Sequence, residues 1–149
     1  LQDVLQRYAE RAFLDIELKV AGLEDAVLRA LRQHAPRRFV VSSFLPSVVR
    51  SMAEKDSSLP LGLICENARQ LARWPELHVS FVIPQYKLAS QELIDDLHRA
   101  GKKVIVWTVN REEDVPRLAE WGVDGIVSDD PEMLARMAAR PPKGREELH

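Results

Sequence analysis

The chain has 149 residues, of which 46% are apolar and 30% are charged, as in an ordinary globular domain with one core. A net charge of −2 and a pI near 6.1 argue against nucleic acid as a partner, and no apolar run approaches the roughly 18 residues of a membrane span. Cys65 is the single cysteine, which excludes an intrachain disulfide and favours a buried, unreactive thiol.

The N-terminal segment predicts a helix, because Leu1, Leu5, Tyr8 and Ala12 fall on one helical face. The chain begins at Leu1 and already reads as the middle of a longer element, so we expect a truncated N-terminus. No signal peptide is visible, and a cytoplasmic location is the default expectation.

Six short runs rich in β-branched and aromatic residues predict strands. They are Phe13–Lys19, Arg38–Phe44, Leu61–Cys65, His78–Pro84, Lys103–Asn110 and Asp124–Asp129. Amphipathic helical patterns separate them. Ser90 is the expected N-cap of one helix, Gly101 its C-terminal stop, and Pro131 the first residue of the last helix. We assign residues 1–140 to one domain and residues 141–149 to a flexible tail.

This alternation predicts a parallel sheet with right-handed crossovers. A doubly wound sheet and a (β/α)₈ barrel both produce the pattern, and periodicity does not separate them. The usual Gly-rich phosphate loop of a doubly wound nucleotide-binding sheet is missing, which disfavours that alternative.

The first predicted strand, FLDIELK, carries charges at every second position. Asp15, Glu17 and Lys19 therefore share one face, opposite the apolar face that we expect to meet the helices. Three buried charges would cost several kcal/mol each unless paired. The mouth of a barrel offers a polar alternative, because inward side chains there line the ligand site. An edge strand with one solvated face is the other interpretation.

Polar groups also gather where the later strands meet their following loops. They are Ser42 and Ser43, Gln85 and Tyr86, Trp107, Thr108 and Asn110, and Ser128 and Asp129. This distribution favours a site built from several strand ends.

Four motifs in order, FLDIELK, VVSSF, VIVWTVN and GVDGIVSDDP, resemble those of the glycerophosphodiester phosphodiesterases. The resemblance spans about residues 13–135. It implies a TIM barrel that hydrolyses glycerophosphodiesters to glycerol 3-phosphate and an alcohol with a divalent metal. It also implies that this chain holds the third to eighth βα units, with the first two units missing.

The resemblance implies roles for three residues. Glu17 matches a metal ligand, Lys19 a phosphate-binding lysine and Trp107 a tryptophan of the substrate pocket. Mg²⁺ or Ca²⁺ suits the carboxylate of Glu17. The Glu17 and Lys19 positions are roughly 6.5–7 Å apart along the strand, so a metal and an ammonium could hold one phosphate from two sides. We expect Asp15, deeper on the same face, to pair with another buried group.

The chain departs from the family at its catalytic residues. The family's His-Arg-Gly motif, its acidic pair and its second histidine are not found, so no catalytic residue is assigned. His34, His78, His98 and His149 do not take their places, and Trp74 and Trp121 are expected to be packing residues at helix ends.

Three hypotheses follow. The first is an inactive C-terminal portion of a metal-dependent phosphodiesterase that acts on a small glycerophosphodiester. The second is a non-catalytic binding or assembly module whose open sheet edges pair with a partner or with a second copy in a homo-oligomer. The third is an open, doubly wound sheet of unrelated function.

Overall fold

A computed structural model describes residues 1–140 of the chain. Six parallel strands form one sheet whose spatial order follows the sequence order from β1 to β6. The strands are β1 (Leu14–Glu17), β2 (Phe39–Ser43), β3 (Leu61–Cys65), β4 (Phe81–Pro84), β5 (Lys103–Val106) and β6 (Gly125–Ile126). Each strand pairs with the next one along the chain, as right-handed crossovers in a barrel require.

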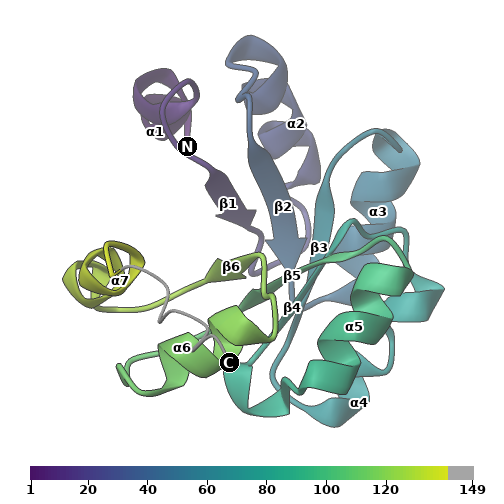
Figure 1. Ribbon diagram of the computed structural model, residues 1–149. Coiled ribbons are helices and arrows are strands. Elements are labelled where there is room, and N and C mark those ends of the chain that lie inside the picture. The colour runs from purple at the N-terminus through teal and green to yellow at the C-terminus, as the bar shows by residue number, and fades with distance from the viewer. Residues whose placement is uncertain (141–149) are drawn as a thin grey trace, which may run out of the picture.

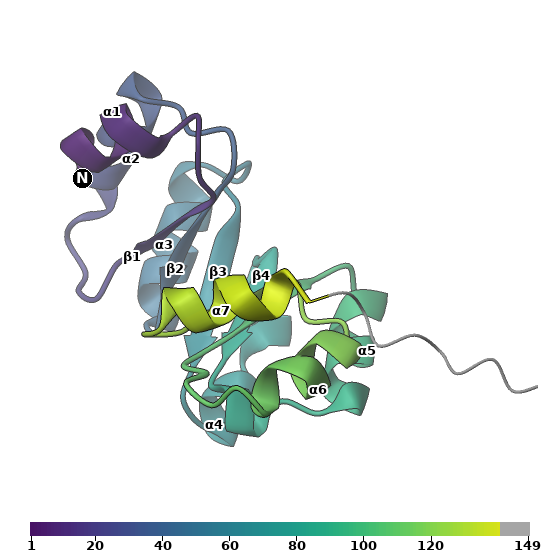
Figure 2. The same ribbon diagram turned by 60° about the vertical axis from the view of Figure 1, so that its left-hand side comes forward.

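Helices connect the strands and lie along the outside of the curved sheet (Figures 1 and 2). They are α1 (Gln2–Tyr8), α2 (Glu24–Gln33), α3 (Pro46–Lys55), α4 (Ala68–Leu71), α5 (Gln91–Arg99), α6 (Asp114–Glu120) and α7 (Pro131–Ala138). Two short 3₁₀ turns, η1 (Trp74–Glu76) and η2 (Tyr86–Leu88), flank β4. No helix within residues 1–140 combines the length and the apolar character that crossing a bilayer requires.

The strands divide the apolar side chains between two layers. The larger cluster lies between the sheet and the helices and includes Leu18, Val41, Leu63, Val82 and Val104. The smaller cluster lies on the other face and contains Val40, Ile64, Phe81, Ile83 and Ile105, with Phe44 and Trp107 packed against it. Because successive residues of a strand alternate between faces, this second cluster is the concave face of the sheet.

Two aromatic contacts show how strongly the sheet curves. The rings of Phe13 and Phe81 are 5.8 Å apart between centroids, although β2 and β3 separate their strands. The rings of Phe44, after β2, and Trp107, after β5, are 5.6 Å apart and perpendicular at 88°. Side chains from non-adjacent strands therefore meet across the concave face. The predicted partial (β/α)₈ architecture with six βα units is confirmed, and the flat, doubly wound alternative is wrong.

The curved sheet remains open. β1 and β6 stand at its two ends, with α1 and α7 beyond them, and no hydrogen bonding joins the two strands (Figure 1). Five exposed large apolar side chains lie on these end segments: Leu1, Val4, Tyr8, Phe13 and Val127. Apolar surface is thus left uncovered at the two ends of the sheet, as it is at Val20, Leu23 and Leu45 in the loops after β1 and β2.

Several predicted details need correction. The N-terminal helix forms, but of its predicted apolar face only Leu5 is buried, whereas Leu1 and Tyr8 are about half exposed. The strand predicted to reach Asn110 ends at Val106, and the strand predicted over Asp124–Asp129 is reduced to Gly125–Ile126. The predicted tail over 141–149 lies outside the described residues.

Candidate functional site at the carboxyl ends of the strands

The charged strand β1 alternates as the sequence predicts. Leu14, Ile16 and Leu18 pack toward the helices, so Asp15, Glu17 and Lys19 belong to the concave face. Glu17 is the last residue of β1 and pairs in register with Ser42, and Lys19 lies two residues beyond it. Both side chains are exposed, and neither forms an ion pair within residues 1–140. The carboxyl ends of the strands form one end of the curved sheet, which we call the mouth. A carboxylate and an ammonium therefore lie at the mouth without a charged partner among the described residues.

Asp15 has a polar partner, as expected. The hydroxyl of Ser42, which is 1% exposed, donates a 2.5 Å hydrogen bond to the Asp15 carboxylate. Partial removal from water raises the pKa of Asp15, the Ser42 hydrogen bond opposes that rise, and the nearby charge of Glu17 adds to it. The pair joins β1 to β2 beneath Glu17, so it acts as a structural support for the mouth.

The loop after β2 is fixed by the second serine of the VVSSF motif. The buried Ser43 hydroxyl donates to the carbonyl of Leu18 at 2.6 Å and accepts from the backbone N–H of Leu45 at 3.1 Å. Leu18 also donates its own N–H to the carbonyl of Ser42. These bonds hold the backbone between Glu17 and Lys19, so the serine sets where both charged residues leave the strand.

Trp107 lies on the opposite side of the mouth. Its backbone bridges to Gln85, and its indole N–H donates to the carbonyl of Ile83 at 2.9 Å. Phe44 approaches the indole edge-on. The ring is therefore held from two directions and presents an apolar wall on the concave face. Sequence reasoning assigned no site role to Phe44, although the alternation that places Ser42 inward also places Phe44 inward.

The last two strand ends are tied together by polar side chains. The Asn110 amide donates to the Asp129 carboxylate at 2.8 Å, and its oxygen accepts from the Ser128 hydroxyl at 3.1 Å and from the Asp129 N–H at 3.0 Å. The polar groups predicted at these ends thus bond mainly with one another. Their role is to order the loops after β5 and β6.

The predicted packing residues behave accordingly. Trp74 and Trp121 both pack against the outer core, and the Arg117 guanidinium lies over the Trp121 ring at 5.4 Å. His78 begins the segment before β4 and contacts the carbonyl of Ser57, and His98 contacts Asp124 before β6. These two histidines are therefore at the amino ends of the strands, away from the mouth.

The donor set for a divalent metal is incomplete within residues 1–140. No group of three or more His, Cys, Asp or Glu side chains converges anywhere in residues 1–140. Mg²⁺ and Ca²⁺ take about six to eight oxygen ligands. Glu17 supplies at most two oxygens, and Asp15 is already engaged by Ser42. The described residues do not by themselves form a metal site.

A cleft of about 560 Å³ lies on the concave face near the amino ends of the strands, between the two open edges of the sheet. Residues of both edges line it, among them Phe13 and Asp15 from the β1 side and Gly125, Ile126 and Val127 from the β6 side. Phe81 and Lys103 form its floor, with the Lys103 ammonium 5.8 Å from the Phe81 ring centroid. The opening between β1 and β6 therefore leads directly to the concave face of the sheet.

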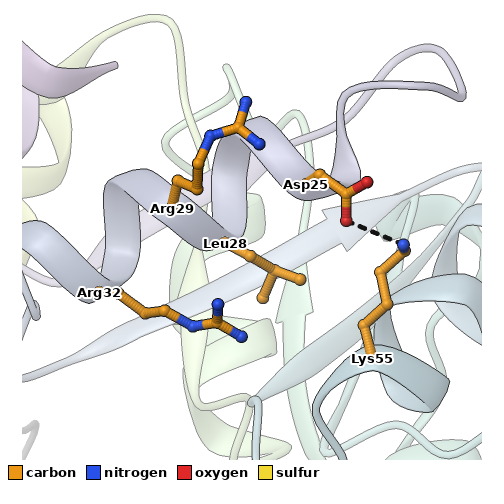
Figure 3. Close-up of a pocket in the computed structure, with 5 residues that line it drawn as sticks. All are labelled: Asp25, Leu28, Arg29, Arg32 and Lys55. Atoms are coloured by element: carbon orange, nitrogen blue, oxygen red, sulfur yellow. Dashed lines mark hydrogen bonds and ion pairs between the residues drawn. The ribbon is translucent and has the colours of Figure 1, made fainter.

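Another hollow, of about 390 Å³, lies between α2 and α3 and is separate from the mouth (Figure 3). Asp25 and Lys55 close one end with a 2.8 Å ion pair, which lowers the pKa of Asp25 and raises that of Lys55. Arg29 and Arg32 extend from α2 on either side of Leu28. None of these residues belongs to a strand, so we give this hollow no part in the candidate site.

Comparison with known proteins shows what this arrangement resembles. The sequence profile of the glycerophosphoryl diester phosphodiesterase family matches residues 3–133. A glycerophosphodiester phosphodiesterase of Caldanaerobacter subterraneus is 28% identical over 94% of this chain and 61% of its own length. One from Bacillus subtilis is 25% identical over 92% of this chain and 53% of its own length. The chain thus spans little more than half of these relatives.

Solved structures agree on the fold. A phosphodiesterase from Oleispira antarctica, in complex with its product sn-glycerol-3-phosphate, matches 93% of this chain and 59% of its own with a TM-score of 0.78 at 24% identity. A glycerophosphodiester phosphodiesterase from Thermotoga maritima matches 92% of this chain and 62% of its own with a TM-score of 0.77 at 19% identity. The open sheet therefore superposes on part of a larger fold.

Proposed function

Because the chain belongs to the glycerophosphoryl diester phosphodiesterase family, we propose that it is the C-terminal portion of an enzyme that hydrolyses glycerophosphodiesters to glycerol 3-phosphate and an alcohol. The observation that carries the proposal is the uncompensated pair of Glu17 and Lys19 at the mouth of a barrel-like sheet. In this proposal the six units are the third to the eighth of the barrel, and this chain alone is inactive.

Each proposed role follows from the chemistry of the side chain. The Lys19 ammonium is a compact cation that can pair with a phosphodiester oxygen. It forms no ion pair with a carboxylate within residues 1–140. Glu17 is proposed as one ligand of a divalent metal, Mg²⁺ or Ca²⁺, whose other ligands come from groups outside the described residues. Such a metal would polarise a phosphoryl oxygen. Trp107 is proposed as a wall of the substrate pocket.

A chimera tests this function. The part of the Caldanaerobacter phosphodiesterase that precedes its matched region is fused to residues 1–149, and hydrolysis of sn-glycero-3-phosphoglycerol is followed with Mg²⁺ or Ca²⁺. We expect turnover by the folded chimera and none by the 149 residues alone. Glu17→Gln and Lys19→Met should each lower kcat/KM by about 10²–10³-fold, as loss of a group that stabilises transition-state charge does.

Two exposed residues away from the mouth provide matched controls. Glu54→Gln and Lys55→Met, both at the C-terminal end of α3, make the same chemical changes and should leave kcat/KM within about twofold. Circular dichroism establishes that each variant folds. The proposal is wrong if the folded chimera turns over equally well with both mouth substitutions, and turnover by the 149 residues alone would disprove that this chain is inactive.

The open edges of β1 and β6, with their exposed apolar neighbours, favour a second candidate function. In it the chain is a binding or assembly module that pairs edge to edge with a partner or a second copy. Concentration-dependent protection of the β1 edge amides from hydrogen exchange would distinguish this module from a monomeric portion of an enzyme.

A further inference from the structure

We propose that Phe44, Glu66 and Trp107 form a subsite for a cationic alcohol, so that the site prefers diesters whose head group is a quaternary ammonium. The inference deepens the proposed function and rests on it for the assignment of the head group to a diester. It starts from the concave face beyond β1, where an aromatic side chain that follows β2 meets one that follows β5.

The aromatic part of the subsite is directly visible. Phe44 and Trp107 meet edge to face at 88°, and both are only partly buried. Ile64 and Ile83 lie beneath them in the concave apolar cluster. The indole cannot turn away freely, because its N–H is bonded to the Ile83 carbonyl. The result is a fixed aromatic corner that is open to the mouth.

The register places a carboxylate in the same row. Gly62 and Ile64 are the concave positions of β3, so the alternation assigns the concave side to Glu66, which directly follows the strand. Cys65 pairs with Pro84 and Gln85 bridges to Trp107, which makes Glu66, Gln85 and Trp107 successive members of one row across β3, β4 and β5. Adjacent strands are about 4.8 Å apart, so Glu66 and Trp107 are about 10 Å apart along the sheet.

Glu66 is free to face a ligand. Its side chain is exposed and has no ion pair or hydrogen bond within the described part of the chain. Its backbone N–H is held by the Gln70 side chain at 2.7 Å, and Asn67 caps the following helix, so the residue occupies a defined turn. An unpaired carboxylate thus follows β3, on the same face as the aromatic corner and between the strands that carry Phe44 and Trp107.

This combination selects a particular chemistry. Aromatic faces attract cations, quaternary ammonium groups above all, by about 0.5–1 kcal/mol at exposed sites and more when water is excluded. A nearby carboxylate adds attraction for the charge but none for a neutral alcohol of the same shape. β3 lies two strands from β1, so a phosphate at Lys19 and a head group at Glu66 occupy different parts of one mouth.

The test uses the 149-residue chain and two probes of one shape. Choline carries the charge, and 3,3-dimethyl-1-butanol replaces its nitrogen with carbon. The Trp107 indole N–H signal, assigned with Trp107→Phe, is followed by NMR during each titration. We expect choline to shift this signal saturably and to bind about three- to tenfold more tightly than the neutral isostere.

Three variants separate the contributions. Glu66→Gln should remove the choline preference and leave the isostere unchanged, Phe44→Leu should weaken both probes, and Glu54→Gln should change neither. Equal binding of the two probes, a choline shift unaffected by Glu66→Gln, or no shift of Trp107 would each overturn the subsite. Glycerol serves as a third probe. If Glu66→Gln weakens the binding of glycerol as much as the binding of choline, the carboxylate binds hydroxyl groups and the cationic assignment is wrong.

A second arm links the subsite to turnover. In the active chimera, sn-glycero-3-phosphocholine should be preferred over sn-glycero-3-phosphoglycerol in kcat/KM. Glu66→Gln should abolish that preference, whereas Glu54→Gln on α3 should leave kcat/KM for both diesters unchanged. No preference in the active chimera overturns the inference. Choline binding by the 149 residues combined with an inactive, folded chimera would refute the proposed function and leave the ammonium subsite standing.

Discussion

Cys65 ends β3 with its thiol fully buried against the helices. Within residues 1–140 its Sγ has one hydrogen-bond partner, the carbonyl of Leu63 at 3.7 Å. Because burial disfavours the thiolate, the pKa of Cys65 rises from 9.0 to about 12. The thiolate is the reactive form of cysteine. This thiol is therefore protected twice, because it stays protonated and because it is buried.

Alkylation measures this protection. At pH 8 we expect iodoacetamide to modify the folded chain much more slowly than the urea-unfolded chain, because the folded thiol is buried and its raised pKa keeps it protonated. The unfolded thiol ionises near pH 9 and the folded one does not, so the free energy of unfolding should fall as the pH rises through 9. Intact-mass analysis and urea titrations give both values, and equal rates in the two states would contradict the buried assignment.

At the same scale, the sequence predicted the direction of the charged residues but not all of their neighbours. Alternation along β1 placed Asp15, Glu17 and Lys19 on one face, because a strand has a fixed period of two. The contact between Phe44 and Trp107 could not be predicted this way, since it joins strands that are not adjacent and depends on curvature. The roles of Glu17, Lys19 and Trp107 stay predictions.

At the scale of elements, β3 shows how the concave surface is shaped. Gly62 pairs with Ser42 on one side and with Phe81 on the other. A Cβ at Gly62 would come within 2.8 Å of Ile83 Cδ1 and 3.2 Å of Val40 Cγ2. The missing side chain therefore lets the larger side chains of β2 and β4 close over β3.

Gly62→Ala tests this packing. We expect a loss of about 1–3 kcal/mol in the free energy of unfolding, the usual cost of inserting atoms into a packed interior. Gly125→Ala on β6 is the control, because its Cβ would meet only Ile105, at 3.2 Å and beyond, so its cost should be smaller. Urea denaturation of both variants measures the difference, and a Gly62→Ala variant as stable as the parent would show that β3 has room to spare.

Element prediction succeeded where local chemistry decides and failed where tertiary context decides. Ser90 caps α5 by accepting from the Leu93 N–H at 3.1 Å, and Gly101 ends that helix region with a φ of +76°, as expected. Pro131 opens α7. By contrast, the apolar face of α1 is largely exposed, because the curved sheet ends beside it and leaves α2 as its main packing partner.

At the scale of the whole molecule, the open edge of β1 determines what the chain can bind. Leu14 donates its N–H to Arg38 and Leu18 to Ser42, so the even positions of β1 bond to β2. The N–H groups of Asp15 and Glu17 consequently point to the free edge of the sheet. An added strand would have to use these two groups.

Hydrogen exchange distinguishes the two candidate functions. For a monomeric portion of an enzyme, we expect the amides of Asp15 and Glu17 to exchange rapidly at every protein concentration, and those of the inner strands, such as Val41, to be protected. An assembly module would protect Asp15 and Glu17 as concentration rises, in step with the mass seen by sedimentation. In the active chimera these amides should become protected at all concentrations.

The spatial order of the strands has a consequence for synthesis. Because the sheet runs from β1 to β6 without a break in sequence order, each strand after β1 leaves the ribosome when a neighbour in the sheet has already been made. No strand has to wait for a distant segment, so assembly can proceed vectorially, one βα unit at a time. Nascent chains arrested after β3 should therefore already resist protease in their first three units.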